Sequence, residues 1–346
     1  MNRINKLLGV TGGLGCDCAV ITDRANVRYL SGFTGSSGYL IISENERLIV
    51  TDFRYVEQAG IQAKGFEVKN SAGFKFGEYI NKFENVAFEN DSVSYKTYLW
   101  LNENCKKLSP LGNTILNIRS IKDSEEIGYI KQAAAIANDA YYHVIDFMKE
   151  GMTERQVARE LEFYMLSHGA DKLSFDTIVA TGDHGSLPHA VPGDKVIRKG
   201  DLVVMDYGCV VGGYCSDMTR TVGIGSVDED SQKAYNTVLK AQLACLEMIK
   251  PEVNCADVHK LSFDIIDSEY PGMYGHTLGH GVGLEVHENP GFSFKHNLPL
   301  KPGTVITVEP GVYIPGKCGV RIEDLIVITD DGFENLCTPP KELIII

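Results

Sequence analysis

The chain has 346 residues, of which 44% are hydrophobic and 23% charged, with 33 Lys and Arg against 46 Asp and Glu. This composition is typical of a globular protein with enough residues for two domains. The formal charge of −13 and the lack of a Lys/Arg cluster argue against nucleic acid or an anionic membrane surface as the main partner.

The nine cysteines are an odd number and follow no repeating frame. Such usage is typical of reduced, mostly buried thiols in a cytoplasmic protein. No stretch approaches the length of a membrane span. The apolar run after Lys6 is broken by glycines and by Asp17, which favours a short helix or turn over a signal peptide. We therefore expect a cytoplasmic protein with no membrane partner.

Short apolar strands alternate with helical stretches in the first 118 or so residues. The sequence predicts strands at CAVIT, GYLIIS, RLIVTD and NVAFEN, and helices around Tyr55–Ala63 and Phe76–Lys82. This alternation indicates a small α/β domain. A boundary is expected near Ile118–Asp123, which divides the chain into residues 1–120 and residues 121–346.

Helices and strands of a larger α+β domain follow this boundary. Asp123 with Glu126, and Thr153 with Gln156, have the spacing of capping boxes that open two helices. The predicted helices are Glu125–Lys149, Thr153–Gly169, Ser231–Ile249 and Ala256–Glu269, and the predicted strands are Phe175–Ala180, Leu202–Tyr207, Met218–Val222, Val305–Val308 and Val320–Ile328.

Two aspartates flank a glycine turn between β-rich segments. Asp206 precedes and Asp217 follows the run Val211-Gly212-Gly213-Tyr214. If Gly212-Gly213 centres a two-residue hairpin, residue 206 stands opposite residue 219, and both carboxylates point to one face. A three-residue loop would put them on opposite faces. Solvated or capping aspartates are the alternative for this pair.

Two glutamates lie in or beside apolar strands near the C-terminus. Glu309 is followed by Pro-Gly, and Glu323 alternates with apolar neighbours. A glutamate on a buried strand face needs a partner, which a metal or a salt bridge can supply. Arg321 lies two residues before Glu323, so it could be that salt-bridge partner or could orient the carboxylate.

Three histidines fall within twelve glycine-rich residues, namely His276, His280 and His287. Glycines on both sides of His280 would let the backbone come close to a metal or substrate. His189 follows Leu187-Pro188 and joins these candidates. The remaining five histidines are expected to be structural or exposed: His143, His168, His184, His259 and His296.

Four carboxylates and one imidazole form the candidate metal-binding set: Asp206, Asp217, His280, Glu309 and Glu323. This oxygen-rich set suits manganese or a similar divalent ion better than structural zinc, which favours thiolate and imidazole. Four carboxylates carry enough charge for two ions, and such a pair activates water and polarises a carbonyl. The residues therefore predict a two-metal hydrolase. Mn²⁺ is the expected ion, and Co²⁺, Zn²⁺ and Fe²⁺ remain open.

Several segments, in this order, resemble the pita-bread metallopeptidases. They are SFDTIVATGDHGSLPHA, MDYGCVVGGYCSDMTRT, HTLGHGVGLEVHENP, TVEPGVY and GVRIEDL. Within that group the chain is most similar to the Xaa-Pro aminopeptidase and Xaa-Pro dipeptidase (prolidase) branch. NVRYLSGFTGSSGYLII and TDFRYVEQA resemble the creatinase-type N-terminal domain of this branch. The resemblance implies an α/β N-terminal domain followed by an α+β pita-bread catalytic domain.

The resemblance also implies a role for each candidate residue. Asp206 would chelate one metal, Asp217 and Glu323 would bridge both, and His280 and Glu309 would bind the other. Activated water would attack the scissile carbonyl, with Glu309 handling its proton. The further catalytic residues would be His189, His276, His287 and Arg321, with the histidines contacting the substrate carbonyl, the oxyanion and the leaving nitrogen. The implied substrates are peptides with proline at the second position, and the implied assembly is a homodimer.

One departure from the family pattern affects the expected substrate. Prolidases commonly place an arginine after the His-Glu-Xaa-Pro motif, where it suits the free carboxylate of a dipeptide, but Gly291 follows Pro290 here. We therefore expect an Xaa-Pro aminopeptidase that acts on longer peptides. The alternatives are a dipeptidase restricted to Xaa-Pro and, more remotely, a non-catalytic peptide-binding protein on the same fold.

Overall fold

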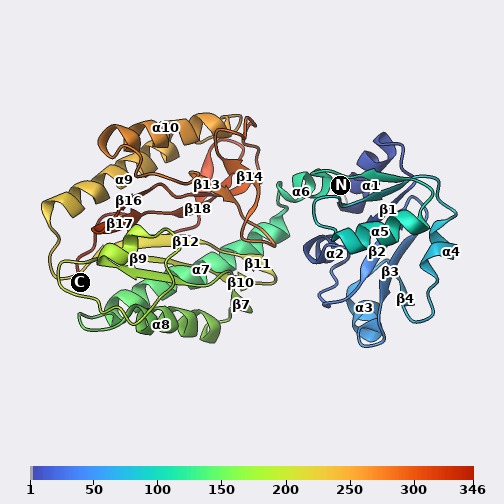
Figure 1. The fold of residues 1–346 in the computed structure, drawn as a ribbon, viewed down its shortest axis with the longest axis horizontal. Coiled ribbons are helices and arrows are strands. Elements are labelled where there is room, and N and C mark those ends of the chain that lie inside the picture. Colours follow the sequence, from blue (N-terminus) through green and yellow to red (C-terminus); the bar gives the residue numbers. More distant parts are fainter. Residues whose placement is uncertain (1–2) are drawn as a thin grey trace. The chain divides into compact units, whose positions relative to one another are not determined.

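The computed structural model describes residues 3–346. The chain divides into two compact units, Met1–Arg119 and Ser120–Ile346. Each unit has its own sheets and hydrophobic core. The first is α/β and the second is α+β, as the sequence predicts (Figure 1).

The N-terminal unit is built on a six-stranded mixed sheet with the order β4-β3-β2-β1-β5-β6. Its central strands are almost wholly buried, because their apolar residues face helices on both sides. The strands are β1 (Cys18–Ile21), β2 (Tyr39–Ser43), β3 (Arg47–Thr51), β4 (Glu67–Asn70), β5 (Val86–Phe88) and β6 (Leu108–Pro110). The helices are α1 (Arg3–Gly13), α2 (Arg24–Ser31), α3 (Val56–Gln62), α4 (Phe76–Ile80), α5 (Tyr95–Asn104) and α6 (Thr114–Arg119).

The C-terminal unit places two pairs of helices on opposite sides of its strands (Figure 1). One pair is α7 (Ser124–Phe147) and α8 (Glu154–Ser167), and the other is α9 (Glu229–Met248) and α10 (Cys255–Glu269). The predicted capping boxes of α7 and α8 are both confirmed. In each box the side chains at the N-cap and the third helical position bond each other's backbone N–H groups, which fixes the first turn.

The strands of this unit form four small sheets. Their orders are β12-β9-β8, β11-β10-β7, β14-β13-β15-β18-β19 and β16-β17. The strands are β7 (Lys172–Leu173), β8 (Ile178–Thr181), β9 (Leu202–Tyr207), β10 (Cys209–Val211), β11 (Tyr214–Cys215), β12 (Met218–Gly223), β13 (Gly279–Gly281), β14 (Glu288–Phe292), β15 (Val305–Val308), β16 (Gly311–Ile314), β17 (Cys318–Arg321), β18 (Asp324–Ile328) and β19 (Phe333–Asn335).

The prediction of one continuous strand over Val320–Ile328 is wrong. β17 ends at Arg321 and pairs with β16, whereas β18 begins at Asp324 and pairs with β15. The chain therefore passes from one sheet to another at Ile322-Glu323. Alternating burial cannot reveal such a change of partner, because both strands are fully buried.

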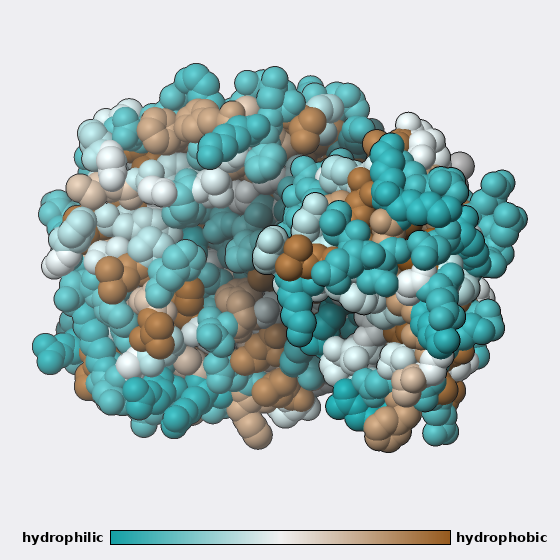
Figure 2. Space-filling model, turned by 45° about the vertical axis from the view of Figure 1, so that its right-hand side comes forward, coloured by the Kyte–Doolittle hydropathy of each residue, from teal (hydrophilic) through white to brown (hydrophobic). Residues whose placement is uncertain are grey.

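The face shown in Figure 2 is mainly hydrophilic, with apolar residues scattered over it. All nine cysteines are free thiols, and eight of them are buried. Among the described residues, no helix is both long and apolar enough to cross a membrane.

Candidate metal centre and active site

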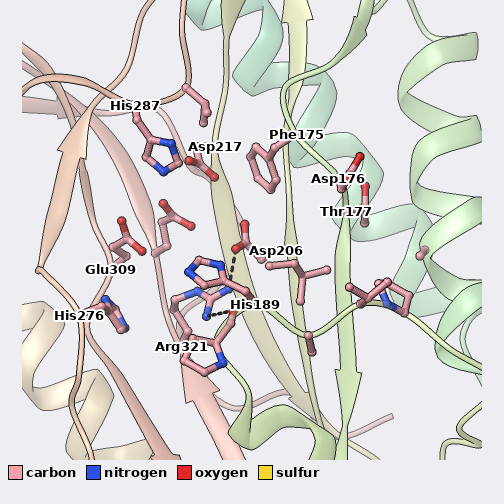
Figure 3. A pocket seen from close by; sticks show the side chains of 18 of the residues that line it. Phe175, Asp176, Thr177, His189, Asp206, Asp217, His276, His287, Glu309 and Arg321 are labelled. Atoms are coloured by element: carbon pink, nitrogen blue, oxygen red, sulfur yellow. Dashed lines mark hydrogen bonds and ion pairs between the residues drawn. The ribbon is translucent and has the colours of Figure 1, made fainter. Parts of the chain in front are cut away.

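A tight hairpin sets the faces of Asp206 and Asp217. The β10–β11 pair turns at Gly212 and Gly213, whose φ angles are 56° and 89°. Positive φ at both central residues is the requirement of a type I′ turn, which glycine meets without steric cost. The register continues into β9 and β12, where Asp206 pairs with Thr219. The predicted register is therefore confirmed, and both carboxylates face the same cavity (Figure 3).

Glu309 and Glu323 lie where two neighbouring chain segments leave one sheet for another. Glu309 follows β15 and precedes β16, and Glu323 lies between β17 and β18. Each backbone N–H is bonded across the site, that of Glu309 to Leu278 O and that of Glu323 to Thr219 O. The change of partner leaves both side chains free to turn inward from the strand ends. Both line the same cavity as the two aspartates.

His280 occupies the middle of β13, and its flanking glycines have a packing role. A Cβ at Gly279 would lie 2.0 Å from Thr307 O, and one at Gly281 would lie 2.6 Å from Asn289 O. The glycines therefore permit close approach of neighbouring backbone rather than of metal or substrate, which corrects the expectation from the sequence. Close packing on both sides fixes the backbone from which the His280 imidazole projects.

The side chains of these five residues converge. One ligand atom each from Asp217, His280 and Glu323 lie within 4.8 Å of one another. His280 Nε2 is 3.2 Å from Glu309 Oε1 and 3.6 Å from Asp217 Oδ2. Figure 3 shows Asp206, Asp217 and Glu309 turned toward one space. The distances suit ions shared between carboxylates and an imidazole.

Burial and mutual repulsion raise the pKa values of three carboxyl groups. For Asp217 and Glu323 the pKa lies well above its ordinary value because of burial and the neighbouring carboxylates. Burial also raises the pKa of Asp206, against the opposing charge of Arg321. A buried cluster of like charges is costly unless a cation compensates it. The cluster therefore has the electrostatics of a cation site.

Glu309 differs from the other three carboxylates. Burial alone would raise its pKa, but the hydrogen bond and positive charge of His280 lower the pKa to about 2. The same contact raises the pKa of His280 against the effect of burial. Glu309 also accepts a hydrogen bond from Thr307 Oγ1 at 3.0 Å. This carboxylate is thus the one held in its charged form by the protein itself.

One fully buried carboxylate oxygen of the cluster has no hydrogen-bond partner among the described residues. Asp206 Oδ1 is buried and unpaired, whereas Oδ2 accepts from Arg321 Nη2. A buried anionic oxygen without a donor is rare and costly. Together with the oxygen-rich donor set, this oxygen fits a divalent metal ion at Asp206. The predicted ligands therefore fit the group that they were expected to hold.

Arg321 links several members of the site but forms no direct ion pair with Glu323. Its guanidinium donates to Asp206 Oδ2, to Thr219 Oγ1 at 3.1 Å and to Tyr313 Oη at 2.8 Å. Thr219 in turn donates to Glu323 Oε2 at 2.7 Å. Of the two roles left open by the sequence, Arg321 thus orients carboxylates, directly at Asp206 and through Thr219 at Glu323.

His276 is hydrogen-bonded through both ring nitrogens. Nδ1 lies 2.8 Å from Thr277 O, so it carries the proton of the neutral ring, and Nε2 accepts from Tyr313 Oη at 2.9 Å. Burial lowers the pKa of His276, which favours this neutral form. His189 and His287 form no hydrogen bond through their rings within residues 3–346 and face the cavity (Figure 3). These two are therefore available to substrate.

Glu154 holds the segment that carries His189. Its side chain is fully buried and accepts from Thr181 N at 2.9 Å, Gly193 N at 3.1 Å and His184 Nδ1 at 2.8 Å. These contacts tie both ends of residues 181–193 to the start of α8. The sequence indicates Glu154 only as a residue of the first helical turn and His184 as structural or exposed. Neither position signals this buried contact.

Two further residues of the site, Thr219 and Tyr313, were not predicted from the sequence. A signal for Thr219 is present in the sequence, because Asp217, Thr219 and Thr221 put polar groups at alternate positions of a buried strand. Tyr313 lies in VEPGVY, where its hydroxyl could be assigned only once the position of Arg321 was known.

The cavity that holds the cluster has a volume of about 790 Å³. This is within the range of sites for small organic ligands. Apolar side chains form part of the cavity wall, including Phe175, Ile178 and Val286. The cavity combines a hard cation site, two imidazoles without hydrogen-bond partners among residues 3–346 and an apolar wall, a combination that can serve the hydrolysis of a carbonyl compound.

Known proteins match both units. Residues 128–330 match Metallopeptidase family M24, and residues 3–121 match the Creatinase/Prolidase N-terminal domain. The Xaa-Pro dipeptidase of Pyrococcus furiosus is 38% identical over 99% of both chains. A solved structure of an Xaa-Pro dipeptidase from Bacillus anthracis is 40% identical, with a TM-score of 0.95 and 99% of both chains covered. An X-Pro aminopeptidase structure from Thermotoga maritima is 36% identical, with a TM-score of 0.90, and the match covers 99% of this chain and 100% of that one.

Proposed function

The chain belongs to metallopeptidase family M24, and on that premise we propose that it is a dinuclear Xaa-Pro dipeptidase. The observation that carries the proposal is the convergence of Asp217, His280 and Glu323 within 4.8 Å in the cavity. The Pyrococcus and Bacillus relatives named as dipeptidases support the dipeptide substrate. They favour it over the longer peptides that Gly291 led us to expect.

The proposed metal ligands are Asp206, Asp217, His280, Glu309 and Glu323, and the proposed ion is Mn²⁺. When bound, a pair of such ions would polarise the scissile carbonyl and lower the pKa of water at the site. Asp217 and Glu323 would bridge the pair. Arg321 and Thr219 would keep the carboxylates in place. The protein's own contribution is this fixed arrangement of charge.

Glu309 is the proposed proton acceptor, because its carboxylate lines the cavity beside the other ligands and is held there by the hydrogen bond from Thr307 Oγ1. His189 and His287 have free ring nitrogens and would donate to the oxyanion and protonate the leaving nitrogen. His276 would act through Tyr313, to which it is bonded. The nitrogen of a prolyl peptide bond carries no hydrogen, so an apolar wall can contact the proline ring without leaving an N–H donor unpaired.

The test is hydrolysis of Ala-Pro by the chelator-treated protein with and without added Mn²⁺, beside Ala-Ala. We expect cleavage of Ala-Pro alone, and only with metal. Metal analysis should find about two ions per chain. Equal cleavage of Ala-Ala would contradict the proline requirement, and full activity without metal would contradict the mechanism.

A second candidate function is an Xaa-Pro aminopeptidase acting on longer peptides. The observation that favours it is Gly291, where prolidases commonly place arginine. Glycine has no side chain that could bind the free carboxylate of a dipeptide, so this position offers no recognition of that group. The ratio of kcat/KM on Ala-Pro to that on Ala-Pro-Ala separates the two candidates.

We further propose that the protein works in the cytoplasm, on the ground of its nine free thiols. The homodimer implied by the family resemblance stays a prediction, which light scattering of the purified protein tests.

A further inference from the structure

Residues of α8 also line the cavity that holds the carboxylate cluster. They are Arg155, Ala158, Arg159 and Glu162, and the neighbouring segment Val191-Pro192 lines the cavity as well. Arg155 and Arg159 are one helical turn apart, so their side chains project from the same side of the helix. Two guanidinium groups thus border the same cavity as the four carboxylates. The proposed mechanism gives neither of them a role.

Three cationic side chains of fixed charge line this cavity, Arg155, Arg159 and Arg321. Arg321 is buried and donates to Asp206, Thr219 and Tyr313, so its guanidinium has no free pair of N–H donors for a ligand. Arg155 forms an exposed ion pair with Asp194, with Nη1 3.1 Å from Oδ1. Arg159 has no ion pair in the part of the chain that the structure describes. Glu162 lies near it on α8, and no ion pair joins the two.

We propose that Arg159, assisted by Arg155, binds the α-carboxylate of the peptide substrate. This inference rests on the proposed function and adds to it the group that recognises the C-terminal end of the substrate. A guanidinium presents two parallel N–H donors that match a carboxylate. The exposed Asp194 pair is weak enough for a substrate carboxylate to compete for Arg155.

The position at which prolidases commonly place an arginine cannot serve here. Gly291 pairs with His280 across β13 and β14, and a Cβ on it would meet the His296 ring. His296 is itself bonded to Ser293 Oγ at 2.8 Å, which holds the ring in that space. Of the three arginines that line the cavity, Arg159 of α8 is the one without an ion pair in the described part of the chain.

If Arg159 binds the substrate carboxylate, its contribution to binding should depend on the length of the peptide. An extended peptide advances about 3.5 Å per residue, so one residue added after proline moves the carboxylate by that distance away from the scissile bond. The peptide whose carboxylate reaches Arg159 should benefit most from it. Free acids and C-terminal amides of the same peptide differ only in this charge.

The experiment compares Ala-Pro with Ala-Pro-NH₂, and Ala-Pro-Ala with Ala-Pro-Ala-NH₂, using the Mn²⁺-loaded enzyme. For at least one pair, the wild type should cleave the acid with the higher kcat/KM. Arg159→Gln should reduce that preference by roughly tenfold or more through KM, because a hydrogen-bonded charge pair is lost. Cleavage of the amides should be unchanged. Arg198→Gln, which removes an exposed arginine outside the cavity, should retain the wild-type ratio.

Three results would overturn the inference. In the first, the wild-type enzyme cleaves neither acid with a higher kcat/KM than the matching amide. In the second, the acid-to-amide ratio of kcat/KM is the same in the wild type and in the Arg155→Gln/Arg159→Gln double variant. In the third, Arg159→Gln lowers kcat/KM equally on acids and on amides. The last would mark a structural effect of Arg159. Failure of the wild type to cleave any of the four peptides would instead refute the proposed function.

Discussion

Thr219 stands directly opposite Asp206 in the β9–β12 ladder, and its hydroxyl connects Arg321 with Glu323. Thr219→Val keeps the shape of the side chain and removes this connection. Glu323 then loses its donor in a buried place. We expect metal affinity to fall by roughly 10–100-fold, as for other partners of metal ligands.

Titration of the metal-free protein with Mn²⁺, followed by calorimetry, measures this change. Thr221→Val is the matched control, because Thr221 is also buried on β12 but bonds only the Arg321 backbone. Thr221→Val should lose about as much stability as Thr219→Val but should bind Mn²⁺ with the affinity of the wild type. Equal affinities of the two variants would contradict the role of Thr219.

Asp217→Asn should change stability in opposite directions with and without metal. Burial and the neighbouring carboxylates raise the pKa of Asp217, so its charged form destabilises the metal-free fold at neutral pH. Removing this charge should raise Tm after chelation. The substitution should also reduce the additional stability that the protein gains when Mn²⁺ saturates the site. For a ligand at 1,000 times its Kd this gain is about 4 kcal/mol.

Calorimetry with chelator or with Mn²⁺ checks both directions, and the exposed Asp330→Asn controls for surface charge. The variant should also lose catalytic activity. A metal-free Tm below that of wild type would show that Asp217 is a structural residue rather than a ligand.

Tyr313→Phe removes the hydroxyl between Arg321 and His276 without changing the ring. The freed His276 nitrogen and one Arg321 donor would then lack their partner. We expect kcat to fall by roughly 10–100-fold with metal content unchanged. Steady-state kinetics and metal analysis of the same preparation test this, and a proportional loss of metal would place Tyr313 in metal retention instead.

Glu154→Gln should loosen the segment that carries His189. In the wild type, the carboxylate of Glu154 accepts from several N–H donors, including those of Thr181 and Gly193. Glutamine keeps one acceptor oxygen, but its amide NH₂ group would face one of these donors. We expect a loss of about 2 kcal/mol in the free energy of unfolding, since these are hydrogen bonds to a buried charge. Urea denaturation measures it. Glu162→Gln, on the same helix at a half-buried position, should lose little stability, and equal losses in the two variants would show that the buried contacts of Glu154 contribute nothing.

His259 should make the protein sensitive to mild acid. Burial, with a smaller effect of His276, lowers its pKa from 6.5, and its Nδ1 accepts the Leu278 N–H at 3.2 Å. Below about 6.5 the unfolded chain binds the proton more readily than the folded one, so the free energy of unfolding decreases as pH falls. His259→Gln should show a smaller decrease between pH 7 and pH 5. The exposed His168→Gln should behave as wild type, and an equal decrease in all three proteins would exclude His259 as the cause.

The sequence by itself determined the alternation of elements, the capping of α7 and α8, and the register of the aspartates. These depend on local chemistry: carboxamide, carboxylate or hydroxyl groups at helix starts, and two glycines that alone accept the type I′ turn. Glu309 and Glu323 could likewise be named as candidates, because acids on apolar strands require a compensating charge, whereas His280 was a candidate from its glycine-rich surroundings.

Only the tertiary structure decided which groups touch. Arg321 proved to bond Asp206 rather than Glu323, since the chain changes sheets at Ile322-Glu323 and the partner strand is distant in sequence. The hydrogen bonds of Glu154 and Tyr313 likewise join residues from separate elements. Such contacts follow from packing between elements, which periodicity and local propensity do not encode.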